Sequence, residues 1–107
     1  LGSDVLIAEA TDSKCYDTVV ISKAADAMLA MSGIEASFVL AKNTQGFISI
    51  SARSRSKLNV QRIMEELGGG GHFNLAAAQI KDLTLSEAGE KLTEIVLNEI
   101  KEKEKEE

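Results

Sequence analysis

The chain of 107 residues has the length of one ordinary domain, and 44% of its residues are hydrophobic, which is enough for a single core. The formal net charge is -5, so the broad basic surface typical of nucleic-acid-binding proteins is absent. Cys15 is the only cysteine and excludes an internal disulfide bond, and no apolar run approaches the length of a membrane span. We therefore expect a cytoplasmic domain without direct membrane contact, in which Cys15 is reduced and at least half-buried.

The first half of the sequence predicts a strand, a helix and a β-hairpin. Strand-forming residues occupy positions 5–8. Apolar residues then recur at helical spacing, which predicts a helix over 18–31. The residues of this predicted buried stripe are Val20, Ala24, Ala27, Met28 and Met31. Residues 36–42 and 47–54 predict two strands, and the turn-forming residues 43–46 between them favour an antiparallel hairpin.

The second half predicts two helices with a strand between them. The apolar residues over 60–67 have helical spacing and follow Asn59, which is suited to an N-cap position. A run of glycines ends that helix, and residues 76–81 predict a strand. The capping-box pair Thr84 and Glu87 begins the final helix.

These elements predict an α/β fold in which a small mixed sheet packs against helices. We place one domain over residues 1–100. The last seven residues, 101–107, are all charged and form a C-terminal tail that extends the final helix into solvent or frays.

The predicted strand over 47–54 has two different faces. Apolar side chains alternate with Ser49, Ser51 and Arg53, so these three residues share one face. That face is small and rich in hydroxyl groups, with an arginine at its end, and it leaves room for a ligand to lie across it. An ordinary exposed sheet edge explains the same pattern equally well.

Four consecutive glycines, from Gly68 to Gly71, precede the only histidine, His72. One glycine is enough to end a helix, and each further glycine carries an entropic cost in ordered structure. Successive backbone N–H groups in such a run can form a nest for an anion, and the histidine can donate to a phosphate or stack on a base. On the residues alone, a phosphate-binding loop and a purely structural turn both remain open.

Several known kinds of site are excluded by what surrounds this glycine run. No Gly-Lys-Ser/Thr follows it, as a Walker A loop requires, and the spacing of a dinucleotide-binding loop is absent. His72 and Cys15 have no carboxylate pair at useful spacing beside them, so we predict neither a metal site nor catalytic residues in this chain.

The glycine run with its histidine, followed by three consecutive alanines over 76–78, resembles the signature of the DHHA1 domain, the C-terminal half of DHH-type phosphoesterases. The resemblance covers nearly the whole chain. The segments 24–39, 48–54 and 59–67 are most similar to the membrane-anchored cyclic-di-AMP phosphodiesterases of Firmicutes.

In this family an N-terminal DHH domain holds two metal ions, usually manganese, and the DHHA1 domain closes over the substrate. The resemblance implies that this chain contacts the phosphate and base of a nucleotide or short oligonucleotide. The residues that it implies for substrate binding are Arg53, Gly69, Gly70, Gly71 and His72, and Ser51 and Asn59 match the family pattern too.

The Asp-His-His motif of the family is missing from this sequence. The resemblance therefore implies that manganese and catalysis belong to a DHH domain of the same parent chain, and that this fragment alone is inactive and needs no cofactor. Whether its helices form a homodimer stays open. The parent is expected to hold this domain on the cytosolic side of a membrane.

Two other functions compete with this hypothesis. One is an RNA-binding module of the DHHA1-like kind found in alanyl-tRNA synthetases, which the low number of Lys and Arg residues disfavours. The other is a structural or dimer-forming domain whose glycines only turn the chain.

Overall fold

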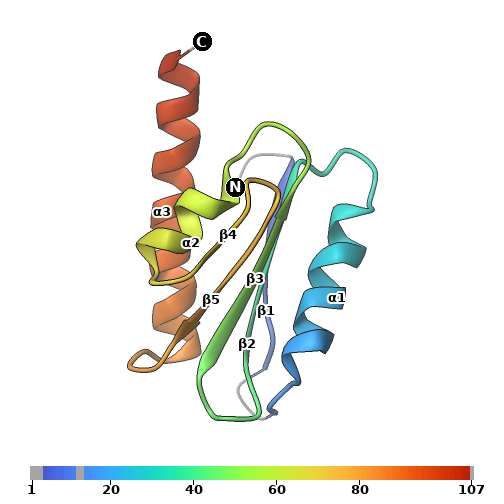
Figure 1. Ribbon diagram of the computed structural model, residues 1–107, viewed down its shortest axis with the longest axis vertical. Helices are drawn as coiled ribbons and strands as arrows, with labels where there is room; N and C mark the ends of the chain where they lie inside the picture. The colour runs from blue at the N-terminus through green and yellow to red at the C-terminus, as the bar shows by residue number, and fades with distance from the viewer. Residues whose placement is uncertain (1–3, 12–13, 107) are drawn as a thin grey trace.

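The computed structural model describes residues 4–11 and 14–106. In this part of the chain one five-stranded sheet has the strand order β1-β2-β3-β5-β4, and helices pack on both of its faces (Figure 1). The strands are β1 (Val5–Glu9), β2 (Ala36–Lys42), β3 (Ile48–Ser54), β4 (Gly70–Gly71) and β5 (Leu75–Ile80), and the helices are α1 (Thr18–Leu29), α2 (Val60–Glu66) and α3 (Leu85–Glu106). The predicted α/β fold with a small mixed sheet is confirmed.

The sheet is mixed because β1 pairs with β2 in parallel, while the other neighbouring strands are antiparallel. The predicted hairpin joins β2 to β3. Its turn is held by Asn43, whose side-chain oxygen accepts hydrogen bonds from the backbone N–H groups of Gln45 and Phe47. The same side chain donates to Ser49 Oγ at 2.9 Å, which ties the turn to the body of the sheet.

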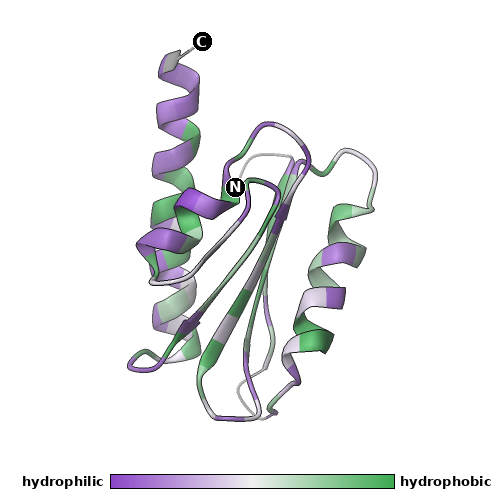
Figure 2. Cartoon of the chain, in the orientation of Figure 1, coloured by the Kyte–Doolittle hydropathy of each residue, from purple (hydrophilic) through white to green (hydrophobic). Residues whose placement is uncertain are grey.

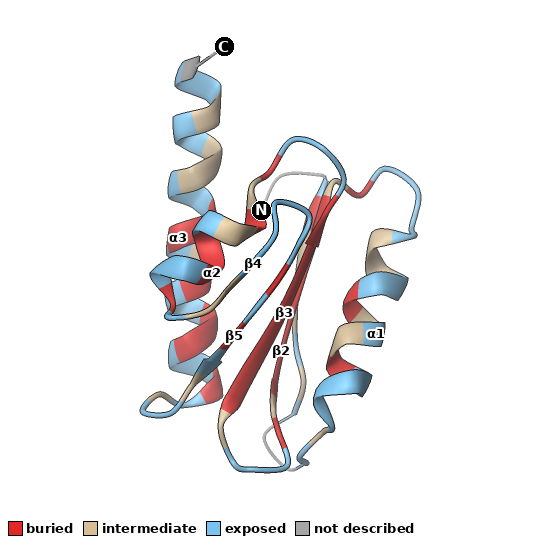
Figure 3. Cartoon of the chain, viewed as in Figure 1, coloured by how far each residue is buried: buried red, intermediate tan, exposed pale blue. Residues whose placement is uncertain are grey.

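The main core lies between the sheet and the helices α2 and α3. Alternate residues of β2 and β3, such as Phe38 and Ile50, point to this side and are fully buried. They pack against Met64 of α2 and Leu92 of α3 within one cluster. Figure 3 shows the buried residues concentrated along the central strands and the facing sides of the helices.

Helix α1 packs on the opposite face, which we call the α1 face. A smaller apolar cluster holds it there, with Ile21 and Ala25 of the helix against Val39 of β2. Ser37 Oγ donates to the backbone carbonyl of Ala25 at 2.7 Å, so small and hydroxyl side chains let the helix approach the sheet closely. The helix covers β2 and β3, whereas the outward residues of β5 remain exposed.

Two expectations, one about α1 and one about Cys15 in the connection before it, are wrong. The stripe predicted from Val20 to Met31 is rotated by about one residue, because Ile21 and Ala25 are buried while Val20 and Met31 are 51% and 55% exposed. Two residues of the predicted stripe, Ala24 and Met28, are partly buried against the same cluster. This segment is apolar around much of its circumference, so spacing alone did not identify the packed side. Cys15 is exposed rather than half-buried, because it lies in the connection just before the helix, outside both clusters.

Helix α3 begins at the predicted capping box and continues through the charged residues. The backbone N–H of Thr84 donates to Glu87 Oε1 at 2.9 Å, and the backbone N–H of Glu87 donates to Thr84 Oγ1 at 3.1 Å. Figure 2 shows that the end of the helix is hydrophilic all round and projects beyond the sheet. None of the helices in the described ranges is both long and apolar enough to cross a membrane.

Candidate functional site

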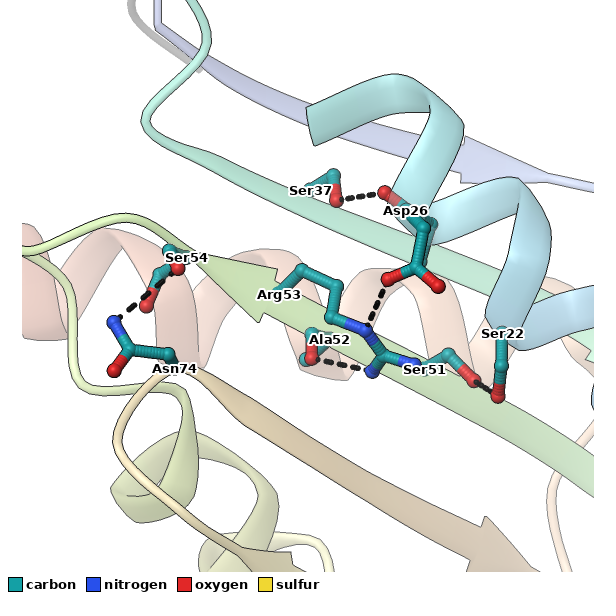
Figure 4. Close-up of polar contacts among 9 residues, drawn as sticks. Ser22, Asp26, Ser37, Ser51, Ala52, Arg53, Ser54 and Asn74 are labelled. Carbon is teal, nitrogen blue, oxygen red and sulfur yellow. Dashed lines mark hydrogen bonds and ion pairs between the residues drawn. The ribbon is translucent and has the colours of Figure 1, made fainter. Parts of the chain in front are cut away.

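Arg53 lies near the end of β3 on the α1 face and is only 8% exposed. Its Nε donates to Asp26 Oδ1 of α1 at 2.7 Å, and its Nη1 donates to the backbone carbonyl of Ala52 at 2.9 Å (Figure 4). These two bonds fix the plane of the guanidinium group. A planar group fixed in this way is pre-organised to bind a second anion.

The third nitrogen of this guanidinium, Nη2, takes part in neither bond. None of the buried side-chain nitrogen and oxygen atoms in the described part of the chain lacks a hydrogen-bond partner. Nη2 therefore retains contact with solvent. Figure 4 shows the guanidinium of Arg53 extended along β3 toward Ser51. This nitrogen thus points along β3 toward Ser51, which is only 4% exposed and lies against α1.

Ser51 belongs to the same polar network. Its Oγ lies 3.1 Å from Ser22 Oγ of α1, and either hydroxyl can be the donor. Ser22 and Asp26 are four residues apart and so lie on one side of the helix, facing β3. Neither residue was predicted from the sequence as part of the site. The signal that could have found them is this pair of polar residues one turn apart in a helix otherwise rich in small apolar residues.

The first two glycines of the run have a structural role. Gly68 has a φ of +85° and its N–H donates to the carbonyl of Glu65, while the N–H of Gly69 donates to the carbonyl of Met64 at 2.8 Å. This is the Schellman arrangement that ends a helix at a left-handed glycine. These two N–H groups therefore serve the cap of α2 and do not face a ligand.

The next glycines form strand β4, which the sequence did not predict. Gly69 and Gly71 pass so close to β5 that an added Cβ would overlap backbone atoms around Ala76 and Ala77. Gly70 differs, because a Cβ added there would meet nothing within 4 Å. The glycine run is thus required partly by the close pairing of β4 with β5, and Gly70 faces open space.

His72 and Leu75 exchange both backbone hydrogen bonds, so they form a directly opposed pair. Gly71, next to this pair, occupies the alternate position whose N–H points to the outer edge of the sheet. Directly opposed residues share a face, so His72 lies on the same face as Leu75. His72 is exposed.

The register brings most of the predicted site residues to the α1 face. Arg53 is opposite Leu75, which is in turn opposite His72, so these three residues form one row from β3 across β5 to the residue that follows β4. Ser51, Ala77 and Gly70 form the adjacent row. Residues of β3 therefore line one surface with residues that lie 19 to 26 positions further along the sequence.

Asn59 is not part of this surface. It caps α2, where its side-chain oxygen accepts from the N–H of Arg62 at 3.2 Å. It lines a hollow of about 210 Å³ on the α3 side, together with Phe73 and Lys103. Its position opposite the α1 face is explained by the N-cap role that the sequence predicted.

The described residues offer no site for the metal ions expected in this family. Nowhere in residues 4–11 and 14–106 do three or more His, Cys, Asp or Glu side chains come together in a way that could hold a metal ion. The site residues do not fit such a group, and the chemistry they offer is hydrogen bonding to an anion by Arg53, Ser51 and His72.

Comparisons with known proteins identify the family of the chain. The family model of the DHHA1 domain matches residues 2–104. The chain is 47% identical over 92 residues to the cyclic-di-AMP phosphodiesterase GdpP of Geobacillus thermodenitrificans, covering 86% of this chain and 14% of that protein. It is 49% identical over 86 residues to the cyclic-di-AMP phosphodiesterase PdeA of Listeria monocytogenes, covering 80% and 13%. The chain therefore spans about a seventh of the length of these relatives.

Two solved structures have similar folds. An exopolyphosphatase-related protein from Bacteroides fragilis is 28% identical with a TM-score of 0.56, over 69% of this chain and 21% of that chain. The C-Ala domain of alanyl-tRNA synthetase from Aquifex aeolicus has a TM-score of 0.57 over 87% and 88% of the two chains, but at 19% identity this likeness concerns the fold alone. Because the family model matches almost the whole chain, the chain belongs to the DHHA1 domain family.

Proposed function

We propose that this chain is the substrate-binding domain of a DHH-family phosphodiesterase and that its α1 face holds the phosphate and base of cyclic-di-AMP or a short oligonucleotide. The observation that carries the proposal is Arg53, whose guanidinium is fixed by two hydrogen bonds while Nη2 keeps access to solvent. The names of the relatives that are 47% and 49% identical support the same substrate.

In this proposal Arg53 Nη2 donates to a phosphate oxygen, and His72 approaches the same ligand from the β4 side of the sheet. Ser51 contributes a hydroxyl beside the guanidinium. These groups bind and orient a diester, which supports catalysis by positioning, but they do not break a bond. Cleavage belongs to a metal-bearing DHH domain of the parent chain, with manganese, and the parent places this domain in the cytoplasm.

The binding test uses the 15N-labelled chain, with amide and Arg53 Nε signals recorded by NMR. The expected result is that AMP, linear pApA and cyclic-di-AMP, added at millimolar concentration, shift the signals of Ser51, Arg53 and Gly70. The Arg53→Met variant should lose these shifts. The matched control is Arg62→Met, because Arg62 is a largely exposed arginine on the other side of the sheet. Absence of nucleotide-induced shifts at all three residues contradicts the proposal.

RNA binding is the alternative that this test also addresses, because the fold resembles a domain of a tRNA synthetase. With a net charge of -5, we expect transfer RNA to bind no better than the short nucleotides. Tight tRNA binding that weakens steeply with salt would favour the alternative instead.

A second test uses a full-length phosphodiesterase that contains this domain. The variants Arg53→Ala and His72→Ala should each lower kcat/KM, because both remove contacts to the substrate. If both leave kcat/KM within about threefold, which corresponds to less than about 1 kcal/mol, the assigned roles are wrong. The chain alone, supplied with manganese, should not hydrolyse cyclic-di-AMP.

A further inference from the structure

The turn between β4 and β5 follows directly after His72. It is a hairpin loop of two residues, Phe73 and Asn74, because His72 and Leu75 exchange backbone hydrogen bonds on either side of them. Hairpin loops of this length favour turn types whose first central residue has a positive φ, since these match the twist of the strands. Among the described residues only glycines have a positive φ, so Phe73 and Asn74 do not form such a turn.

Strand β4 offers little that could compensate for this turn. It lies at the edge of the sheet and pairs with β5 alone. Its residues, Gly70 and Gly71, have no side chains to bury, and glycine loses the most conformational freedom when it becomes ordered. The position of the turn therefore depends on contacts from outside this hairpin.

Such contacts come from the end of β3 and the start of α2. The carbonyl of Phe73 accepts hydrogen bonds from Ser54 Oγ at 3.2 Å and from the backbone N–H of Val60 at 3.0 Å. The carbonyl of Asn74 accepts from the backbone N–H of Ser54 at 3.0 Å. Ser54 is only 4% exposed, so it holds the turn from a position largely shielded from water.

Asn74 adds its side chain to these contacts. Its Nδ2 donates to the backbone carbonyl of Ser54 at 3.3 Å and to that of Arg55, and Figure 4 shows the amide directed at Ser54. The ladder between β3 and β5 ends where Arg53 pairs with Leu75. The side-chain amide therefore continues the link between the two segments beyond the end of the ladder.

We propose that Asn74 is a positioning residue, which fixes His72 relative to Arg53 through these hydrogen bonds. Asn74 lies two residues after His72, and Ser54 directly follows Arg53, so the bonds join the chain beside one residue to the chain beside the other. Asn74 itself contacts no ligand in this proposal. The fixed turn does not depend on a ligand, whereas its consequence for a bound nucleotide rests on the proposed function.

An ordinary turn residue and a hydrogen-bond donor make different demands on position 74. Asparagine and aspartate are both favoured in turns and have nearly the same size. Aspartate has no N–H, and its carboxylate would face the two carbonyl oxygens that Asn74 now binds. Asn74→Asp therefore removes the donor but keeps the turn-forming character.

The first experiment measures hydrogen exchange of backbone amides in the 15N-labelled chain by NMR. In Asn74→Asp and Asn74→Ala, the amides of His72 and Leu75 should exchange at least about tenfold faster, while that of Ile50 in β3 stays unchanged. Asn98→Ala, at an exposed asparagine of α3, is the matched control and should change none of these rates.

The second experiment measures kcat/KM of a full-length phosphodiesterase that contains this domain. Asn74→Asp should lower kcat/KM by at least about threefold. It should cause no further loss in the His72→Ala background, because its effect passes through His72. A residue that only stabilises the fold would cause the same loss in both backgrounds, and that result would contradict the proposal.

The outcomes separate this inference from the proposed function. Unchanged exchange rates in Asn74→Asp overturn the positioning role, even where Arg53→Ala lowers kcat/KM as the proposed function expects. Faster exchange, together with kcat/KM values that neither His72→Ala nor Asn74→Asp lowers, supports the fixed turn and contradicts the role of His72 in substrate binding.

Discussion

The two faces of the sheet are filled in different ways. Toward α2 and α3 the space is filled by large apolar side chains with no exposed surface, such as Phe38, Ile50 and Leu92. Toward α1 the buried groups include Ser37 and Arg53, each of which is hydrogen-bonded, and the packing stops at β3. The face toward α2 and α3 therefore stabilises the fold, while the face toward α1 positions polar groups beside an exposed surface.

The energies of the two kinds of contact explain why one face can supply stability while the other positions polar groups. Full burial of a large apolar side chain contributes about 1.5–3 kcal/mol, whereas an internal hydrogen bond adds a net of about 0.5–1.5 kcal/mol. A hydrogen-bonded network of modest net stability still restricts geometry, because each group must keep its partner once it is buried. A change at an exposed residue of the α1 face should therefore cost little stability.

The largest expected effect comes from the apolar side. Phe38→Ala removes a fully buried aromatic side chain and should lower the free energy of unfolding by about 3–5 kcal/mol, measured by urea titration. Leu75→Ala, at a 51% exposed position of β5, is the control and should change the free energy of unfolding by no more than about 0.5 kcal/mol. Similar losses for the two variants would contradict the division between the faces.

Two variants in the glycine run compare a tightly packed position with an open one at the edge of the sheet. Gly69→Ala places a methyl group against the backbone of β5 and should cost about 1–3 kcal/mol of unfolding free energy. Gly70→Ala enters open space and should leave stability unchanged or raise it by up to about 1 kcal/mol, because alanine restricts the unfolded chain. Thermal and urea unfolding of both variants measure the difference, and equal destabilisation would show that Gly70 is also tightly packed.

The ion pair between Asp26 of α1 and Arg53 of β3 should contribute less to the free energy of unfolding. Asp26→Ala leaves a largely buried guanidinium with one partner fewer and should cost about 1–2 kcal/mol, a value kept low because the carboxylate is 62% exposed. The control is Lys23→Ala, an exposed position of the same helix, for which no loss is expected. The 15Nε signal of Arg53 should also exchange faster with water in Asp26→Ala, and an unchanged exchange rate would contradict the anchoring role.

The smallest effect is expected at the start of α3, which packs on the opposite side of the sheet from Arg53. Hydrogen bonds from the backbone N–H and then the side chain of Thr84 lower the pKa of Glu87. A lowered pKa means that the carboxylate stabilises the fold above its ordinary pKa and that this contribution disappears as the pH falls through the lowered value. Glu87→Gln should therefore be less stable than the original chain at neutral pH and equally stable in acid. A difference that does not depend on pH would rule out the charge as its cause.

Sequence patterns predicted most of the elements because their signals are local. Alternation in the strand around Ile50, the turn at Asn43 and the capping box at Thr84 each depend on residues close in the chain. β4 was missed because a two-residue glycine strand has no side-chain pattern and exists only through its pairing with β5. The rotation of the α1 stripe was missed because an alanine-rich helix can pack on several sides.

The candidate site residues could be named from the sequence: the face with Ser51 and Arg53, and the glycine run with His72, both through alternation or composition and through resemblance to a family. The contacts of these residues could not, because folding brings Asp26 to Arg53, puts Asn59 on the opposite side, and pairs Leu75 with Arg53. The physical reason is that side-chain periodicity acts over a few residues, whereas strand register and helix coverage are set by packing between distant segments.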